Sequence, residues 1–418
     1  MDKVLYVGYY DILRNGQQIR NYSLAAAKKM NFVFESVAEL GYHVDVVSPS
    51  FIKTRDNVKV NQTRENLEPN VDLVLTPSWG AKNKISRIAR VLYSNFWLFS
   101  YLLKNTQKNT PVLVYHNYAL ALPVLAAQKL KKFHLILEIE EQYSMVWKLT
   151  PYQKWKEDAL LKKGKKDTLV VSELLAEKLG VENPIVSYGS YSAFRGTIPE
   201  RTASDGKIKL VYTGSIDKVK GSAFTAIDAM KYLPDNYELK ISGPVAAKDK
   251  NDFDELVKQT NKGCGRNAVE YLGLLDEQQY EKLLLSANIA LNPQKEGGFG
   301  QYLFPSKILT YMSYGLPVVS TRGESIVKSK VADLITFSDD YSGESVAKAI
   351  RNADIKASTV YLKKLDDLKK EFLTGIDKVL STRGKTNDIK ENNTKSICAA
   401  GGFDNCFDVE ILLFWSGE

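Results

Sequence analysis

The chain has 418 residues, of which 44% are apolar and 25% charged, and it carries a net charge of +8 with a pI near 9.0. The length exceeds one ordinary hydrophobic core, so we expect two domains, and the composition is typical of a globular protein. The positive charge favours anionic partners, but the lysines are spread along the chain rather than gathered in a nucleic-acid-binding module. We therefore expect no nucleic acid partner.

The three cysteines, Cys264, Cys398 and Cys406, are scattered and odd in number. They fit neither a disulfide framework nor a zinc-binding spacing, so we expect a reducing compartment and no metal site. The first residues, MDKVLYVGYY, read as a strand rather than as a charged start followed by a long apolar core. We therefore expect no signal peptide and a cytoplasmic location.

The first half of the chain alternates short apolar runs with helix-length segments, beginning with a helix over residues 22–40. Near-continuous Val, Ile and Leu runs in such an alternation indicate the α/β class, with a doubly wound parallel sheet. The predicted strands are KVLYVGYY at the N-terminus, HVDVVSPS, and residues 71–76, 111–116, 134–139, 168–172 and 184–190.

A basic and aromatic segment at residues 82–104 interrupts this alternation, with an apolar run over 91–103. That run is shorter than the ~20 apolar residues that span a bilayer. The pattern fits a core helix with a basic end at least as well as a segment lying on an anionic membrane. Its basic residues are Lys82, Lys84, Arg87 and Arg90.

The alternation restarts after a polar linker at residues 200–207, so the chain holds two similar α/β halves. A ligand is then expected at the carboxyl ends of the strands, in the cleft between the halves. An amphipathic helix is predicted over 357–380, followed by a tail that we expect to be disordered or a non-native extension. The strands predicted in this half are residues 208–214, 237–243, 268–273, 289–293, 316–320 and 333–337.

Glycines follow the first strand of each half, in GYYDILRNG and in YTGSIDKVKGS. Glycine lets a phosphate or sugar approach the backbone, although Gly8 and Gly16 fit simple turns equally well. Lys220 stands beside Gly221 at a predicted helix start, where a lysine opposes the helix dipole. A bound anion would explain this lysine, and the alternative is an exposed, solvated side chain.

The stretch EGGFGQYLFPSK places Glu296, a glycine-rich loop and a lysine before another short helix. A helix start offers unpaired N–H groups to a phosphate, and a carboxylate accepts hydrogen bonds from sugar hydroxyls. This combination predicts a site for a sugar that carries phosphate groups.

Three acids, Glu138, Glu140 and Glu141, crowd at the carboxyl end of the strand at 134–139. Crowded acids raise one another's pKa, which suits acid–base or cation-stabilising chemistry, and the alternative is a solvated acidic loop. His116 is a second catalytic candidate. A single histidine is more often structural, and His116 has no partner in a zinc-binding motif.

Taken together, residues 1–380 resemble a glycosyltransferase of the GT-B fold, close to the retaining family 4 enzymes of bacterial polysaccharide assembly. The resemblance rests on residues 210–243, on residues 268–294 and on EGGFGQYLFPSKILTYMSYGLPVVS. It implies two Rossmann-like, doubly wound domains facing across a cleft. The expected divisions are an acceptor domain at 1–198, a donor domain at 199–355, a helix crossing back at 356–380 and the tail at 381–418.

The resemblance also implies residue roles. Lys220 would contact the donor diphosphate, Glu296 would contact the donor sugar, and Leu272 and Leu274 would flank the backbone that reads the nucleobase. Catalytic roles are expected for Glu140, Glu296, Lys220 and His116. The donor-binding set is Gly16, Gly214, Ser215, Lys218, Lys220, Gly243, Leu272, Leu274, Glu296, Phe299, Gly300, Ser306, Lys307 and Thr310.

Three positions depart from the family pattern. Ser215 stands where many relatives have arginine, so Lys218 or Lys307 is expected to supply the missing charge. Thr310 stands where the acid that holds the ribose is expected. Glu140 falls where a histidine usually ends the strand, which makes it the first candidate for catalysis in the first domain.

The resemblance implies transfer of a sugar from a nucleoside diphosphate to a saccharide or lipid-linked saccharide acceptor, with retention and without a metal or other cofactor. Capsule, exopolysaccharide or O-antigen synthesis is the implied setting, with peripheral contact at the inner face of the plasma membrane. Two alternatives stay open. One is a nucleotide-sugar 2-epimerase, and the other is a degenerate, non-catalytic subunit of a polysaccharide-assembly complex, which Ser215 and Thr310 favour.

Overall fold

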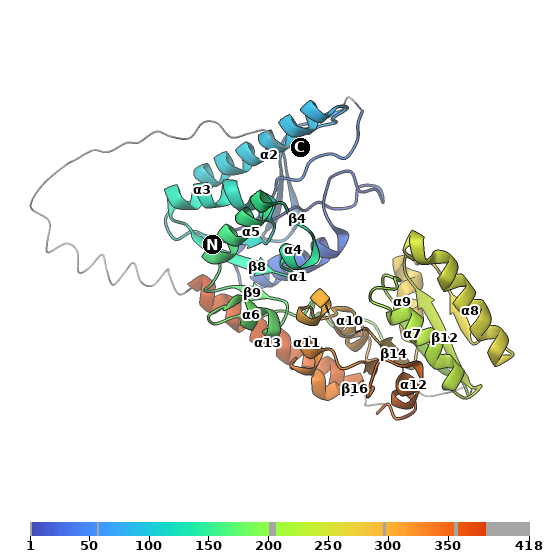
Figure 1. The fold of residues 1–418 in the computed structure, drawn as a ribbon. Coiled ribbons are helices and arrows are strands. Elements are labelled where there is room, and N and C mark those ends of the chain that lie inside the picture. Colours follow the sequence, from blue (N-terminus) through green and yellow to red (C-terminus); the bar gives the residue numbers. More distant parts are fainter. Residues whose placement is uncertain (1, 57, 200–205, 296–297, 355–357, 382–418) are drawn as a thin grey trace, which may run out of the picture.

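The computed structural model describes residues 2–56, 58–199, 206–295, 298–354 and 358–381. Within these ranges the chain forms two large, mainly parallel sheets, each flanked by helices (Figure 1). The predicted doubly wound α/β architecture is confirmed. None of the described helices is long and apolar enough to cross a membrane.

The first sheet has the strand order β10-β9-β8-β7-β1-β2-β5-β4, and every pair in it is parallel except the edge pair of β4 and β5. The order reverses direction at β1, which lies between β7 and β2, and this is the topological switch point of such a sheet. The strands are β1 (Lys3–Val7), β2 (His43–Ser48), β4 (Thr63–Glu68), β5 (Val71–Leu75), β7 (Pro111–Tyr115), β8 (His134–Ile139), β9 (Leu169–Val170) and β10 (Ile185–Val186).

The helices of this first unit form two packed groups. The helices α2, α3 and α5 contact one another in sequence, and α1 contacts β2 and β5. A small antiparallel pair, β3 (Lys59–Val60) and β6 (Ser78–Trp79), lies beside α2. The helices are α1 (Leu24–Glu39), α2 (Lys84–Asn105), η1 (Tyr118–Leu120), α3 (Ala121–Lys131), α4 (Tyr143–Val146), α5 (Pro151–Lys163) and α6 (Glu173–Leu179).

The second sheet has the strand order β13-β12-β11-β14-β15-β16, and all of its pairs are parallel. Its switch point falls between β11 and β14. The strands are β11 (Ile208–Thr213), β12 (Tyr237–Ser242), β13 (Val269–Tyr271), β14 (Ile289–Asn292), β15 (Val318–Ser320) and β16 (Ile335–Phe337). The helices are α7 (Ser222–Ala229), η2 (Met230–Tyr232), η3 (Ala247–Asp249), α8 (Lys250–Cys264), α9 (Glu277–Ser286), η4 (Gly298–Tyr302), α10 (Lys307–Ser313), α11 (Glu324–Val327), η5 (Ala332–Leu334) and α12 (Gly343–Arg351).

The central strands explain why the sequence reads as continuous apolar runs. All six residues of β8 and all four of β14 are buried, because helices cover both faces of a parallel sheet. Several helices begin at a side-chain cap, among them α1, α2, α6 and α12. Thr150 and Asp276 each form a capping box, at the starts of α5 and α9.

The last described helix, α13 (Ser358–Ser381), joins the two halves. It corresponds to the helix predicted over 357–380 and contacts α10 of the second half together with α1 and β10 of the first. Its buried stripe follows the helical period, so both halves share one hydrophobic core along it. The members of that stripe are Tyr361, Leu365, Leu368, Phe372, Ile376, Val379 and Leu380.

Candidate functional site

The switch point of the second sheet brings two loops together. The loop after β11 contains Lys220, and the loop after β14 contains Lys295, whose backbone N–H donates to the Lys220 carbonyl at 3.0 Å. In open α/β sheets, ligands bind beyond the carboxyl ends of the strands at this point. The residues predicted to bind a donor phosphate therefore lie where the topology favours a ligand.

Gly214 and Gly243 pack backbone to backbone at the carboxyl ends of β11 and β12. A Cβ on Gly243 would lie 2.0 Å from the Gly214 carbonyl oxygen, and the two glycines have φ values of 127° and 142°. Larger residues are therefore excluded at Gly243 by space as well as by conformation. A Cβ on Gly214 would lie 3.2 Å from Nζ of Lys307, so this glycine leaves room for the lysine.

Lys307 is the first residue of α10, and the residue is half-buried beside the end of β11. Its Nζ lies 4.1 Å from the ring centroid of Tyr212, and within the described ranges no carboxylate or carbonyl accepts a hydrogen bond from it. Burial and then the charge of Lys220 lower the pKa of Lys307 to about 7. A desolvated cation beside a second cation is a site that an anion would stabilise.

Lys220 has an exposed side chain, and its backbone N–H donates to Oδ1 of Asp217 at 2.8 Å. Gly221 follows with φ of 66° and is the N-terminal cap of α7. The two lysines predicted as substitutes for the missing arginine differ, because Lys218 forms an ion pair with Asp252 whereas Lys307 faces Gly214. Ser215 is exposed, and its carbonyl accepts a hydrogen bond from the Tyr212 hydroxyl.

The start of α10 contributes two further predicted residues. Ser306 is exposed and makes no side-chain cap, and a Cβ on Gly189 of the first half would lie 3.2 Å from its Cβ. Thr310 lies one turn further on and is half-buried. The start of α10 is therefore placed between the two halves of the molecule.

The glycine-rich loop is described only in part. Glu296 lies outside the described residues, as does the side chain of Phe299. Gly300 lies in η4, where a Cβ would approach Nε2 of Gln294 to 3.1 Å.

A cavity of about 300 Å³ adjoins this loop and extends to the carboxyl end of β15. Its polar residues carry no sequence motif, although each follows a strand end of the second sheet. They include Gln294, Lys295, Thr321, Arg322 and Glu324.

The loop after β13 carries Leu272 and Leu274. The Leu272 N–H donates to Ile241 within the sheet, and the Gly273 carbonyl accepts from the N–H of Gly243. The side chain of Leu274 is 76% exposed, so it is free to contact a ligand.

The acids of the first half occupy three different environments. Glu138 is buried, and the Tyr6 hydroxyl donates to it; burial and then the Glu140 charge raise the pKa of Glu138 to about 8. Glu140 forms an ion pair with Lys29, whose Nζ lies 2.9 Å from Oε1 of Glu140, and the same Nζ donates to the Ser187 carbonyl at 2.6 Å. The predicted catalytic acid Glu140 is therefore already neutralised by a lysine of α1.

Glu141 is the acid that interacts with the second half. Burial and then the Glu140 carboxylate raise the pKa of Glu141, while the Lys220 ammonium acts in the opposite direction. The carboxylate that interacts electrostatically with Lys220 of the second half is therefore that of Glu141, whereas the predicted catalytic acid was Glu140.

His116 lies behind this acidic segment and is only 2% exposed. Its Nδ1 donates to the Glu141 carbonyl at 3.1 Å, and burial lowers the pKa of His116 to about 4. Glu157 of α5 supports the same segment by accepting the backbone N–H groups of Tyr143 and Ser144 at 2.5 and 3.0 Å. The geometry gives His116 a positioning contact to Glu141, and its catalytic role stays a prediction.

Gly16 lies at the tip of a two-residue hairpin turn. Asn15 and Gly16 have φ values of 51° and 73°, and Arg14 and Gln17 exchange backbone hydrogen bonds at 2.9 and 3.0 Å. This is the type I′ turn that Asn-Gly favours, so the turn alone explains the glycine. A Cβ there would contact nothing within 4 Å, which leaves space beside the tip.

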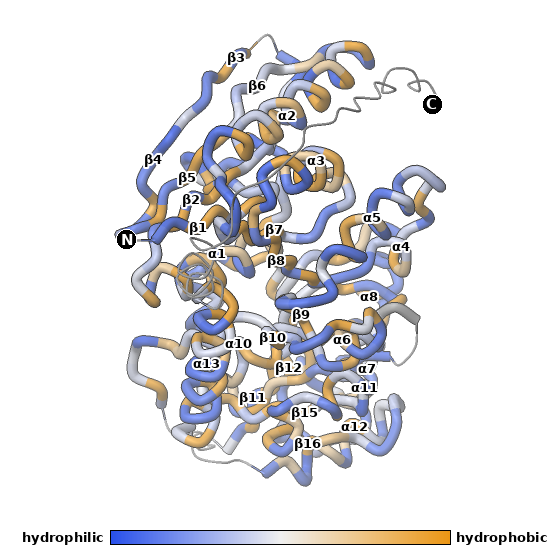
Figure 2. Tube along the Cα trace, turned by 90° about the vertical axis from the view of Figure 1, so that its left-hand side faces the viewer, coloured by the Kyte–Doolittle hydropathy of each residue, from blue (hydrophilic) through white to orange (hydrophobic). Residues whose placement is uncertain are grey.

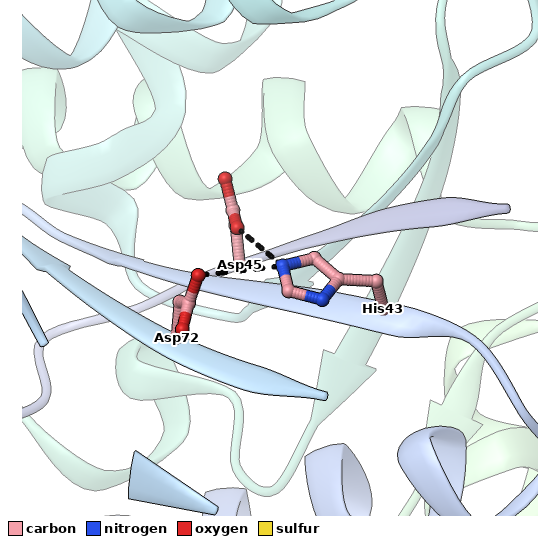
Figure 3. Close-up of side chains that lie close together, drawn as sticks. All are labelled: His43, Asp45 and Asp72. Carbon is pink, nitrogen blue, oxygen red and sulfur yellow. Dashed lines mark ion pairs between the residues drawn. The ribbon is translucent and has the colours of Figure 1, made fainter. Parts of the chain in front are cut away.

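One trio of side chains in the described part of the chain has the spacing of metal ligands, namely His43, Asp45 and Asp72 (Figure 3). Arg64 donates to both carboxylates, and Nζ of Lys3 lies 2.7 Å from Asp45. The two carboxylates are therefore already neutralised, and the cluster is explained as an ion-pair network at the amino ends of β2 and β5.

Comparison with known proteins identifies the fold. Residues 207–353 match the sequence model of the family described as glycosyl transferases group 1, and no curated protein matches the chain. Sucrose-phosphate synthase from Thermosynechococcus elongatus covers 94% of this chain and 100% of its own at 15% identity and a TM-score of 0.56. The lipopolysaccharide outer core galactosyltransferase WaaB covers 91% and 99% at 12% identity and 0.57.

HepE from Anabaena, solved with UDP and glucose, covers 92% of this chain and 100% of its own at 13% identity and a TM-score of 0.56. At these identities the structures show the fold alone. The protein has the GT-B fold of two Rossmann-like domains, as predicted, and the residues that match the group 1 model lie in its second half.

Proposed function

We propose that this protein is a glycosyltransferase that moves a sugar from a nucleoside diphosphate to a saccharide acceptor, with retention at the anomeric carbon. The observation that carries the proposal is the ammonium group of Lys307, which lies beside the bare backbone of Gly214 and has no described acceptor. The matching family model over residues 207–353 and the UDP and glucose bound by HepE support a nucleotide-sugar donor.

Leaving-group stabilisation is the chemistry this arrangement offers. When a sugar leaves a nucleoside diphosphate, negative charge develops on the phosphates, and Lys220 and Lys307 would both face it. The N-terminus of α7 begins directly after Lys220 and adds unpaired N–H groups. These groups supply the positive charge that a divalent cation supplies elsewhere, so the proposed mechanism includes no metal.

The sugar's anomeric carbon develops positive charge in the same step, and a carboxylate nearby would stabilise it. Glu141 is proposed as this acid, because the charge of Lys220 acts on its carboxylate. Its backbone carbonyl accepts a hydrogen bond from His116. Glu296 is proposed to hold the sugar hydroxyls, on the family resemblance.

The acceptor is proposed to be a lipid-linked saccharide of capsule, exopolysaccharide or O-antigen synthesis, at the inner face of the plasma membrane. The fold shared with WaaB, a lipopolysaccharide outer core galactosyltransferase, supports a role of this kind. A degenerate, non-catalytic subunit is the second candidate, because Thr310 offers no carboxylate to a ribose.

Nucleotide binding tests the proposal directly. We expect one of UDP, GDP, CMP and dTDP to raise the melting temperature without added metal, because a ligand of the native state stabilises it by mass action. Lys307→Met should weaken that binding by roughly tenfold or more, the loss of one charge-assisted contact. Lys258→Met on the exposed face of α8 is the matched control and should bind as the wild type does.

Transfer then separates the two candidates. Sugar transfer or donor hydrolysis by the purified protein supports the enzyme. Nucleotide binding with neither activity supports the non-catalytic subunit, and equal binding by the Lys307 variant and the wild type would refute the site itself.

A further inference from the structure

Helix α2 presents an apolar surface to solvent. The side chain of Ile85 is 79% exposed and that of Phe96 is 67% exposed, and Ile88 and Leu92 are exposed between them. These four residues recur at the helical period and form one stripe. We call this stripe, together with its flanking Lys82, Lys84 and Arg87, the α2 face.

The opposite side of α2 fixes the helix on the first domain. Arg90, Ser94, Leu98 and Leu102 are buried at intervals of four residues. The Arg90 guanidinium donates to the Ile52 carbonyl at 2.7 Å and to the Trp79 carbonyl at 3.0 Å. Rotation that would bury Phe96 would have to expose this arginine and leave those carbonyls unpaired, so the apolar stripe faces outward.

The charge along α2 and α3 is of one sign. Residues 73–137 contain nine lysines and arginines and no aspartate or glutamate. This stretch includes α3, which packs against α2 and adds an exposed Leu130 (64%) between Lys129 and Lys131. Both helices lie at the end of the molecule away from α12 and β16 (Figures 1 and 2).

We infer that the α2 face docks the protein on the surface of an anionic lipid bilayer. Lipid supplies both components that the face requires, an apolar layer for Ile85 and Phe96 and negatively charged headgroups for Lys84 and Arg87. The helix lies in the plane of the surface, because its inner face stays packed on the domain. None of these residues belongs to the proposed donor site, so vesicle binding and nucleotide binding can be tested separately.

Vesicle flotation tests this docking with the full chain. Wild type should float with vesicles of phosphatidylcholine containing roughly 30% phosphatidylglycerol, and much less with phosphatidylcholine alone. Raising the salt from ~0.1 M to ~0.5 M should reduce the bound fraction, because headgroup attraction is screened.

Two variants of the face separate its components. Ile85→Ser with Phe96→Ser removes the apolar part, and Lys84→Gln with Arg87→Gln removes charge; each should lower the vesicle partition coefficient by about tenfold or more. Matched controls remove the same kinds of exposed side chain elsewhere, through Leu24→Ser with Val360→Ser and Lys258→Gln with Lys262→Gln. Both controls should float as wild type does, and every variant should keep the wild-type thermal shift with nucleotide.

Three outcomes would overturn the inference. The first is absence of wild-type flotation with anionic vesicles. The second is flotation of both α2 variants at the wild-type level. The third is a wild-type dimer that the Ser variant converts to a monomer in light scattering, which would assign the α2 face to a second copy of the chain.

Discussion

The Lys307 ammonium nitrogen lies 3.2 Å from the position that a Cβ of residue 214 would occupy. Strand β11 therefore ends in a residue without a side chain where the cation of α10 reaches it. A ligand that approaches this backbone therefore also contacts the cation.

Gly214→Ala should weaken nucleotide binding by about tenfold or more and lower the melting temperature. The added methyl group crowds Nζ of Lys307, and the φ of 127° is unfavourable for alanine. Gly263→Ala in α8 is the control, because a Cβ there contacts nothing and alanine favours the helix. Titration calorimetry and a thermal melt on both variants measure the two effects, and wild-type binding by Gly214→Ala would contradict the close approach.

Nucleotide affinity should fall as the pH rises from 7 to 9. Burial and the charge of Lys220 lower the pKa of Lys307 to about 7, and a bound diphosphate would raise it, so binding takes up a proton over this range. Calorimetry in buffers of different ionisation enthalpy counts that proton. Lys307→Met should abolish the pH dependence, and an unchanged slope in this variant would assign it to another group.

Glu138→Gln should stabilise the fold relative to wild type at pH 8.5, by a few kcal/mol and by more than at pH 6. The pKa of Glu138 is raised to about 8 in the folded state, above its unfolded value of 4.5. Its stabilising contribution is complete below pH 4.5 and is lost as the pH rises through 8. Urea unfolding of both proteins at pH 6 and 8.5 isolates this carboxyl, and a difference that does not grow with pH would contradict it.

Glu141→Gln and Glu140→Gln should separate function from stability. Loss of the Glu141 charge should lower kcat by tenfold to a thousandfold if it stabilises the cationic sugar, with little change in melting temperature. Loss of the Glu140 charge should lower the melting temperature, because the buried Lys29 ammonium loses its carboxylate partner and keeps only the Ser187 carbonyl. The reverse pattern would restore Glu140 as the catalytic acid.

Most of the two sheets could be predicted from apolar runs alone, and one edge strand shows where that reading fails. The strand β4 has the sequence TRENLE, with only one large apolar residue, because it is an antiparallel edge strand. Arg64 of this strand pairs with Asp45 and Asp72 across the sheet. Charged edges of this kind carry no hydrophobic signal. Two other predicted strands, at 168–172 and 184–190, are shorter in the structure, where they span Leu169–Val170 and Ile185–Val186.

The donor-side prediction rested on order along the chain, and order does bring Gly214, Lys220 and Lys307 together. Order along the chain could not predict which side chains from distant segments pair with one another. The pair of Lys29 and Glu140 joins residues 111 positions apart. Lys218, which the family resemblance offered as one of two substitutes for the missing arginine, pairs with Asp252 instead. Lys295 and Arg322 carried no motif, and only the sheet order reveals that both follow strand ends beside the cavity.

Helix α13 has a consequence for how the protein is made. Its residues come after the whole second sheet in the chain, yet Phe372 packs against Phe32 of α1 and Gly375 faces Ile185 of β10. During synthesis the apolar surface of the first domain that α13 covers therefore stays exposed. It is covered only after the second domain and α13 have emerged from the ribosome. A nascent chain that stops before residue 358 holds all strands of both sheets and an unfinished first domain. The first domain is synthesised first, but its core is complete only when α13 packs on it.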